Sequence, residues 1–191
     1  MERVTGILGG VFDPPHLGHV ALARAALSQL GLEHLLVLVV ADPGHKGVET
    51  PAEIRLALTR LAFADVEGTD VELDPHARTV DSLEARPLAD PVFVIGADEL
   101  ADFHRWKSPG RVLELARLAV ARRPGVSTEA FAEALARLPD PSRVVFFELE
   151  PQEISSTRIR ERAAAGEPID DLVPAAVASE IARLGLYRES E

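Results

Sequence analysis

The sequence predicts an α/β fold: a doubly wound parallel sheet in three layers, followed by a helical C-terminal segment. Short apolar runs alternate with helical stretches through residues 1–150, which is typical of parallel strands joined by right-handed crossover helices. Residues 151–191 carry helical patterns without intervening strands. Because 191 residues is an ordinary length for one domain, we expect a single domain, 1–191, made of these two parts.

Strands are expected where apolar residues run together. Leu35–Val40 is apolar throughout, as is typical of a strand covered on both faces. The other expected strands are Val4–Leu8, Pro91–Ile95, Leu118–Ala121 and Val144–Phe147. A sheet of this Rossmann-like kind binds ligands beyond the carboxyl ends of its strands, so the loops at those ends are where we look for a site.

Helices are expected from apolar spacing and from start and stop residues. The stretch Ala52–Ala64 has Pro51 at its first turn and places Ile54, Leu58 and Leu61 on one face. Ser108 before Pro109 resembles an N-cap. The remaining expected helices are Gly18–Leu30, ended by Gly31; Thr128–Leu138; Arg158–Ala165, ended by Gly166; and Pro174–Leu184, ended by Gly185.

Composition narrows the classes of function. The net charge of −11 disfavours nucleic acid and anionic membranes as partners. The absence of cysteine excludes disulfides and thiolate metal sites. The first residues lack the pattern of a secretory signal, and the longest apolar run, Leu35–Ala41, is too short to cross a bilayer. We therefore expect a soluble, cytoplasmic protein, and the sequence is compatible with a homo-oligomer without predicting one.

The loop after the first strand has the composition of a phosphate site. Gly9 and Gly10 permit a tight turn and close backbone approach, and Gly18 lies at the start of the next helix. His16 and His19 are three residues apart and so share a face of its first turn. A helix start offers unpaired N–H groups and positive potential, to which two imidazoles add donors.

Other interpretations of this loop remain. Two histidines at this spacing are often a solvated helix face, and together with Asp13 they suit a zinc ion. The H-E-x-x-H pattern of zinc enzymes is absent, as are the lysine-bearing phosphate loop and a strict G-x-G-x-x-G. We therefore expect no protein-bound metal here, and neither a P-loop ATPase nor a dinucleotide dehydrogenase.

The segment Gly9–His19 resembles the G-G-S/T-F-D-P-x-H-x-G-H signature of nucleotidyltransferases with an H-x-G-H motif. Val11 departs from it, because serine or threonine is usual at that position. The resemblance implies that Gly9, Gly10, Phe12 and Gly18 bind ATP and that Asp13 binds the second substrate. It also implies that His16 and His19 contact the triphosphate as catalytic groups.

A second motif lies near the C-terminus, at Ile154–Arg160. Thr157 and Arg160 share a helix face, and an arginine fork suits phosphate oxygens, although a capped amphipathic helix explains the same residues. The segment resembles the I-S-S-T-x-I/L-R signature of nicotinate mononucleotide adenylyltransferases. That family implies ATP contacts for Ser155, Ser156 and Thr157, and a catalytic role for Arg160.

Landmarks between the motifs follow the same family. Lys46 corresponds to the lysine of a P-P-H-K loop and would place a catalytic positive charge near phosphate. Ala77–Leu83 resembles S-Y-T-I/V-D-T-L, with Arg78 where tyrosine is common, and implies that Thr79 binds substrate; Thr79 also suits the cap of a short helix.

Three further positions complete the resemblance. Gly96 and Asp98 match the family's G-A-D after a strand and imply contacts with the ATP ribose, although an acid there is sometimes only a helix cap. Trp106, the only tryptophan, is implied to stack on the pyridine ring, where a core anchor is the ordinary role. Arg123 resembles the arginine of an R-P-G turn and is a further candidate substrate contact.

The resemblance implies transfer of AMP from ATP to nicotinate mononucleotide, giving deamido-NAD and pyrophosphate in NAD biosynthesis. Mg²⁺ is expected to arrive with ATP rather than in a site of its own. One alternative is phosphopantetheine adenylyltransferase or another small-molecule nucleotidyltransferase. An alternative of another class is a nucleotide sensor that does not catalyse a reaction.

Overall fold

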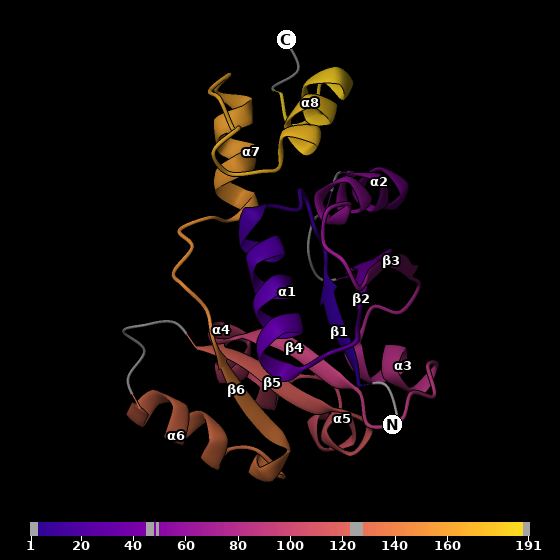
Figure 1. Cartoon of the computed structure of the whole chain (residues 1–191), viewed down its shortest axis with the longest axis vertical. Coiled ribbons are helices and arrows are strands. Elements are labelled where there is room, and N and C mark those ends of the chain that lie inside the picture. The colour runs from indigo at the N-terminus through magenta and orange to yellow at the C-terminus, as the bar shows by residue number, and fades with distance from the viewer. Residues whose placement is uncertain (1–3, 45–47, 49, 123–127, 189–191) are drawn as a thin grey trace.

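The structure is a computed structural model that describes residues 4–44, 48, 50–122 and 128–188. Six strands form one sheet in which every neighbouring pair is parallel. They are β1 (Thr5–Gly10), β2 (His34–Val40), β3 (Thr69–Asp74), β4 (Val92–Gly96), β5 (Arg117–Arg122) and β6 (Val144–Glu148). The order β3-β2-β1-β4-β5-β6 confirms the doubly wound, Rossmann-like prediction (Figure 1).

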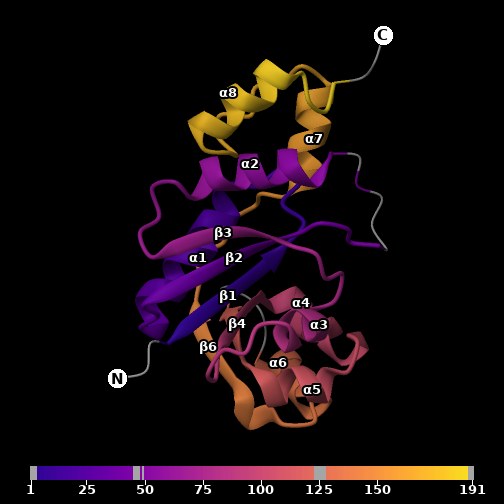
Figure 2. The ribbon, with the colours of Figure 1, turned by 90° about the vertical axis from the view of Figure 1, so that its right-hand side faces the viewer.

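Helices cover both faces of the sheet (Figures 1 and 2). Along β2, Leu35, Val37 and Val39 belong to one buried cluster, while Leu36 and Leu38 belong to the other. Because successive side chains of a strand point to opposite faces, this alternation produces the three predicted layers. One face packs on α1 (Leu17–Leu30) and α2 (Ala52–Phe63); the other packs on α3 (Thr79–Glu84), α4 (Ala97–Asp102), α5 (Pro109–Leu115) and α6 (Thr128–Ala136).

The C-terminal helices return to the first half of the chain. After β6, residues 149–155 run beside α1 to α7 (Ser156–Ala164) and α8 (Ala175–Leu184), which lie close to α2 (Figures 1 and 2). Ile159, Val177 and Ile181 are buried in the same cluster as the side chains of α1 and α2. This burial holds the start of α7 beside the loop that follows β1.

The buried face of α2 differs from the one predicted. Leu61 is 37% exposed, while Arg55, Leu58 and Thr59 are at most 1% exposed. The true stripe therefore follows the spacing 55, 58, 59 and 62 and includes a charged residue. Apolar spacing missed it because an arginine was not expected to point into the core.

Three further local expectations need correction. The edge strand β3 was not predicted, because acidic residues occupy alternate positions in it. Thr79 is the first residue of α3, with Arg78 rather than Thr79 at the N-cap position. Ser108 does occupy the N-cap position of α5, but in a left-handed conformation with φ 50° and without a side-chain capping bond.

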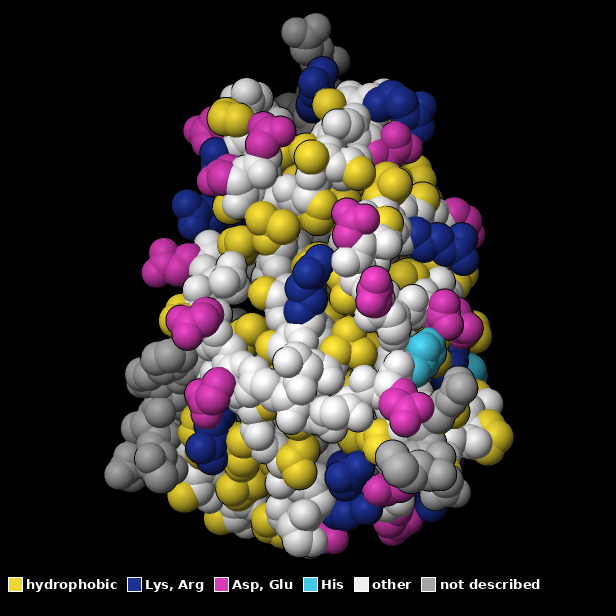
Figure 3. Space-filling model, in the orientation of Figure 1, with side chains coloured by type: hydrophobic (Ala, Val, Ile, Leu, Met, Phe, Trp, Pro, Cys, Tyr) yellow, Lys and Arg dark blue, Asp and Glu magenta, His cyan; other side chains and the backbone are white. Residues whose placement is uncertain are grey.

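The surface mixes charges. Acidic and basic side chains are interspersed over the face of the molecule in Figure 3, with apolar atoms between them. Within the described ranges, no helix combines the length and the apolar character needed to span a membrane. The charged side chains on the face shown in Figure 3 are thus dispersed and do not form a patch of one sign, although the net charge of the chain is −11.

Candidate active site

A cavity of about 610 Å³ opens at the carboxyl edge of the sheet. Its walls come from the loop after β1, the ends of β2, β3 and β4, and the start of α7. The following residues singled out from the sequence line it: Gly9, Gly10, Phe12, Asp13, His19, Thr79, Gly96, Trp106, Ser156, Thr157 and Arg160. Most of the predicted site is thus brought together in one place.

The cavity has two sides. The loop side consists of residues 9–19 with Ser156, Thr157 and Arg160; the tryptophan side consists of residues 74–79 with Trp106. They belong to different faces of the sheet, since α7 packs on the α1–α2 face while α3 and α4 pack on the other.

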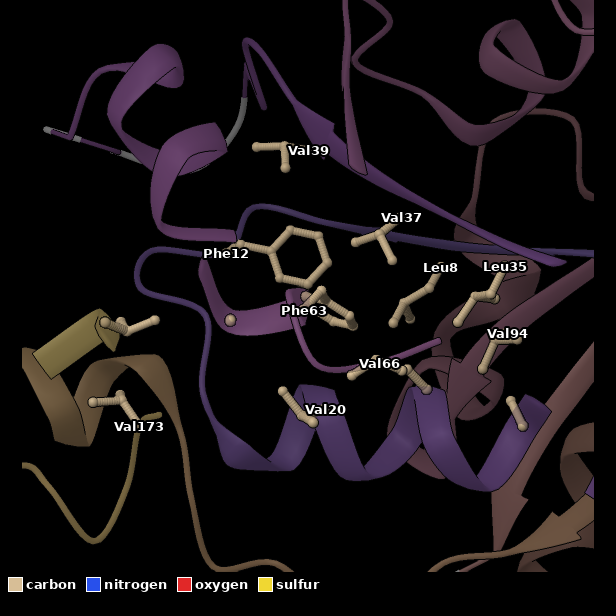
Figure 4. Close-up of a cluster of buried hydrophobic side chains, with 14 of the residues drawn as sticks. Leu8, Phe12, Val20, Leu35, Val37, Val39, Phe63, Val66, Val94 and Val173 are labelled. Carbon is tan, nitrogen blue, oxygen red and sulfur yellow. The ribbon is translucent and has the colours of Figure 1, made fainter. Parts of the chain in front are cut away.

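Phe12 shapes the loop side. Its φ of 52° lies in the left-handed region, which residues other than glycine rarely adopt. Its ring is 2% exposed and lies in the core near Phe63 (Figure 4). A Cβ on Gly10 would lie 2.9 Å from this ring, so the glycine makes room for Phe12.

The two histidines stack instead of lying side by side on a solvated surface. The rings of His16 and His19 have centroids 3.7 Å apart, and Phe12 contacts the His19 ring edge-on at 4.9 Å. His16 is 7% exposed, and its Nδ1 is buried without a hydrogen-bond partner among the described residues. Since a Cβ on Gly18 would lie 3.0 Å from that Nδ1, Gly18 makes room for the His16 ring.

Both imidazoles are neutral at neutral pH. Burial lowers the pKa of His16 from 6.5 to about 4. Burial, and then the proximity of His16, hold the pKa of His19 well below 6.5. The backbone N–H of His16 donates to Nδ1 of His19 at 3.2 Å, so the proton of neutral His19 resides on Nε2. His19 can therefore offer the cavity an N–H donor.

The two sequence motifs meet directly. Nη1 of Arg160 donates to the backbone oxygen of Asp13 at 2.6 Å, and the Ser156 hydroxyl donates to that of Pro14 at 2.8 Å. Nη2 of Arg160 also donates to Oγ1 of Thr157 at 3.3 Å. These bonds bring the two distant segments together and join α7 to the loop.

Other expected site residues lie elsewhere. His16 and Gly18 lie behind His19 and do not line the cavity. Ser155 caps α7, because its Oγ accepts the Arg158 N–H at 3.2 Å. Asp98 lines an adjoining hollow that shares Trp106 with the main cavity. Lys46 and Arg123 fall outside the described residues.

The tryptophan side is built from side chains. Trp106 packs against Phe103 at 5.0 Å and Phe93 at 6.1 Å between ring centroids, and it also lines the cavity. Nearby, Nδ1 of His76 lies 2.9 Å from Oδ1 of the buried Asp74, and both residues line the cavity. Trp106 thus makes the core contact that is its ordinary role and also borders the cavity, while its stacking on a pyridine ring stays a prediction.

Comparison with known proteins identifies the family. A sequence model of the cytidylyltransferase-like family matches residues 7–162. A protein of Roseiflexus sp. (strain RS-1), named "Probable nicotinate-nucleotide adenylyltransferase", is 39% identical over 96% of this chain and 97% of its own length. The chain belongs to the nicotinate-nucleotide adenylyltransferase family. A Bordetella avium protein of the same name is 35% identical over 98% of the chain and 99% of its own length.

Solved structures of this adenylyltransferase family share the fold. Nicotinic acid mononucleotide adenylyltransferase of Plasmodium falciparum, complexed with NaAD, matches with a TM-score of 0.81 at 16% identity. The match covers 97% of this chain and 98% of that protein. A structure of the same enzyme with APC gives a TM-score of 0.78. At this identity the likeness concerns the arrangement of the backbone.

Sequence reasoning missed four residues at this adenylyltransferase site. Arg55 is buried behind the first loop, and the apolar spacing of α2 gave no signal for it. Tyr187 donates its hydroxyl to Oδ1 of Asp13 at 2.7 Å, which no local pattern indicates. Glu99 accepts the Gly96 N–H at 2.8 Å and lines the cavity, one residue beyond Asp98. His76 lies in the loop between β3 and α3, outside the segment compared with the family.

Proposed function

We propose that this chain is a nicotinate-nucleotide adenylyltransferase that transfers AMP from ATP to nicotinate mononucleotide. The supporting observation is the meeting of the two motifs at one cavity, through Arg160 with Asp13 and Ser156 with Pro14. Family membership, with relatives aligned over nearly the full chain, supports the same reaction. The whole chain acts as one nucleotidyltransferase domain, in which residues 1–150 carry the sheet and 151–191 bring the second motif.

The reaction needs no protein base. A mononucleotide phosphate carries about 1.5–2 negative charges near neutrality, so its oxygen is already a nucleophile. It forms a bond to the α-phosphorus of ATP in line with the leaving group. The bond from that phosphorus to the bridging oxygen of the β-phosphate breaks, and pyrophosphate leaves with the electron pair. The protein contributes alignment of two repelling anions and stabilisation of the charge on the leaving group.

The loop side is assigned to the triphosphate. His19 offers a neutral Nε2–H to a phosphate oxygen, since its Nδ1 is already engaged. Arg160, Ser156 and Thr157 border the same space at the start of α7. His16 acts by orienting His19 through its backbone N–H. Gly9, Gly10 and Phe12 contribute backbone groups, and Lys46 remains a predicted source of positive charge for the phosphates.

The tryptophan side is assigned to the mononucleotide. Trp106 presents a ring to the cavity against which a pyridine can stack, and Thr79 lies on the same side. Gly96 and Asp98 are assigned to the ribose of ATP, and Asp13 and Arg123 to the second substrate. These roles come from the family motif, residue by residue.

Magnesium is proposed to enter as part of MgATP, held by phosphate and water as this ion commonly is. Asp13 is the carboxylate of the first loop that lines the cavity, and its Oδ1 already accepts the Tyr187 hydroxyl. ATP and nicotinate mononucleotide are the partners we propose, without nucleic acid or a membrane, and we place the protein in the cytoplasm.

The decisive test is pyrophosphate release by the purified chain. We expect release only when ATP, Mg²⁺ and nicotinate mononucleotide are all present, with deamido-NAD formed in equal amount. Parallel reactions with nicotinamide mononucleotide and with phosphopantetheine measure substrate preference and the rival adenylyltransferase activity. Binding of ATP without turnover of any of the three acceptors would establish the sensor instead.

A further inference from the structure

Arg55 is the most buried charged side chain near the cavity, and the mechanism above does not use it. It is 1% exposed, yet no carboxylate lies within hydrogen-bonding distance of it among the described residues. Its guanidinium donates instead to backbone oxygens: Nε to Thr50 at 3.0 Å, Nη1 to Val11 and Val40 at 2.8 Å each, and Nη2 to Ala41 at 2.8 Å.

These four carbonyls come from three separate segments. Val11 belongs to the loop after β1, Val40 and Ala41 to the end of β2, and Thr50 to the entry of α2. Val11 and Val40 line the cavity, so the guanidinium lies directly behind its wall. One side chain therefore sets the spacing between the loops that follow two neighbouring strands.

The contact with Val11 also sets the direction of a peptide group. In a trans peptide the C=O and the N–H point in opposite directions. With the Val11 oxygen held by Arg55, the N–H of Phe12 points away from the guanidinium. The left-handed φ of 52° at Phe12 belongs to this same turn.

The charge of Arg55 matters as well as its shape. Burial lowers the pKa of Arg55 and the nearby Asp13 charge raises it, but a guanidinium stays protonated at neutral pH in either case. A positive charge held away from water acts more strongly on a neighbouring anion than an exposed one does.

We propose that Arg55 is a positioning residue for phosphate binding: it orients the Val11–Phe12 peptide toward the cavity and adds buried positive charge behind it. This inference rests on the proposed function for the identity of the phosphate, a nucleoside triphosphate or its pyrophosphate part. It also explains why valine can stand at position 11, where serine or threonine is usual. The contact with Arg55 is made by the backbone oxygen of this residue and not by its side chain.

The test compares three variants by calorimetric binding of inorganic pyrophosphate, after circular dichroism has confirmed folding. Arg55→Lys keeps the charge but loses the fork, and Arg55→Met loses both. Arg143→Met is the control, because Arg143 also donates to a backbone oxygen, that of Leu113 at 2.9 Å, but from the turn just before β6 and away from the cavity, where it also pairs with Asp90 at 2.8 Å.

We expect Arg55→Lys to weaken pyrophosphate binding about 10-fold and Arg55→Met about 100-fold, the range of lost charge-assisted hydrogen bonds. Arg143→Met should bind as the wild type does. KM for ATP should rise in step with the loss of affinity, while KM for nicotinate mononucleotide changes less than about 3-fold, within the spread of indirect effects. Equal losses for both substrates, or no loss of pyrophosphate affinity, would overturn the proposal.

A second measurement uses the wild-type chain, so that it holds even if the variants do not fold. In a nitrogen–proton correlation spectrum, titration with pyrophosphate should shift the Phe12 amide and the Arg55 Nε–H together. An unshifted Phe12 amide at saturation would refute the proposal. If both signals shift but no acceptor is adenylylated, the inference about Arg55 stands and the proposed function fails.

Discussion

On the loop side of the cavity, backbone groups of residues 9–19 are held by side chains from other elements. Arg55 holds Val11, Arg160 holds Asp13, and Ser156 holds Pro14, each through a carbonyl oxygen. On the tryptophan side, the ring of Trp106 projects from the connection between two short helices, and the ion pairs of its chain neighbours Arg105 and Lys107 are exposed, whereas the Asp74–His76 pair is largely buried. Lys107 and Asp81, for example, lie 2.7 Å apart with side chains 54% and 36% exposed.

This difference separates two kinds of recognition. The hydrogen bonds to these carbonyls fix the conformation of the loop before a ligand binds, and with it the direction of the loop's N–H groups. A preformed set of such donors suits the phosphates common to all nucleoside triphosphates. A ring on an exposed connection has fewer restraints, and its contacts depend on the side chain itself. The loop side should therefore govern the rate of transfer, and the tryptophan side should govern which mononucleotide is accepted.

The largest expected effect is that of His19→Ala on turnover. Loss of one well-placed donor to developing charge lowers kcat by about 10²–10³, and because the phosphate site keeps its other donors, KM for ATP should change far less. Steady-state kinetics with both substrates measure the split. His34→Ala, at the far end of β2 and paired with Asp70, is the control. Near-normal kcat in a folded His19→Ala protein would remove His19 from the mechanism.

The next effect is on stability in acid. Since the pKa of His16 is about 4 in the folded chain and about 6.5 when unfolded, protons bind the unfolded chain preferentially between these values. The free energy of unfolding should fall as pH drops from 6.5 to 4, by about 3 kcal/mol for this residue. Urea unfolding at pH 7 and pH 4.5 should show a smaller fall for His16→Asn. An identical fall in both proteins would contradict the burial argument.

A smaller and selective effect is expected on the tryptophan side. Trp106→Ala removes the stacking surface and should raise KM for nicotinate mononucleotide about 10-fold, the scale of lost base–aromatic stacking. KM for ATP should remain close to the wild-type value. Trp106→Phe keeps the packing on Phe103 and Phe93 and should restore most of the affinity. A larger change in KM for ATP than for the mononucleotide would reverse the assignment of the two sides.

The smallest effect concerns the C-terminal contact with the loop. Burial and the Asp13 carboxylate raise the pKa of Tyr187, so its hydroxyl remains a donor throughout the neutral range. Tyr187→Phe removes this bond to a buried carboxylate and should lower the free energy of unfolding by about 1 kcal/mol. Denaturant titration measures it, with Ser179→Ala as a control, because Ser179 bonds only within α8. A loss of turnover greater than that of His19→Ala would make Tyr187 part of the phosphate site.

Much of the fold was open to prediction because the central strands are apolar on both faces. Leu35–Val40 and Leu118–Ala121 predict buried parallel strands without any tertiary information, and right-handed crossovers between such strands predict a doubly wound sheet. The order of the six strands came from the structure. The edge strand β3 was not predicted, because only one of its two alternating sets of side chains is apolar. The two motifs could also be identified from the sequence, since the residues of each motif are contiguous in the chain.

Patterns of neighbouring residues are enough to predict the layered parallel sheet, the two motifs and the chemistry that their residue types favour. Other features become visible only in the folded chain: His16 and His19 are neutral and stacked, Asp13 is bonded to Tyr187, and Arg55 lies behind the loop. Those features arise from burial and from contacts between residues far apart along the chain. The local sequence pattern does not indicate which residues surround a side chain after folding.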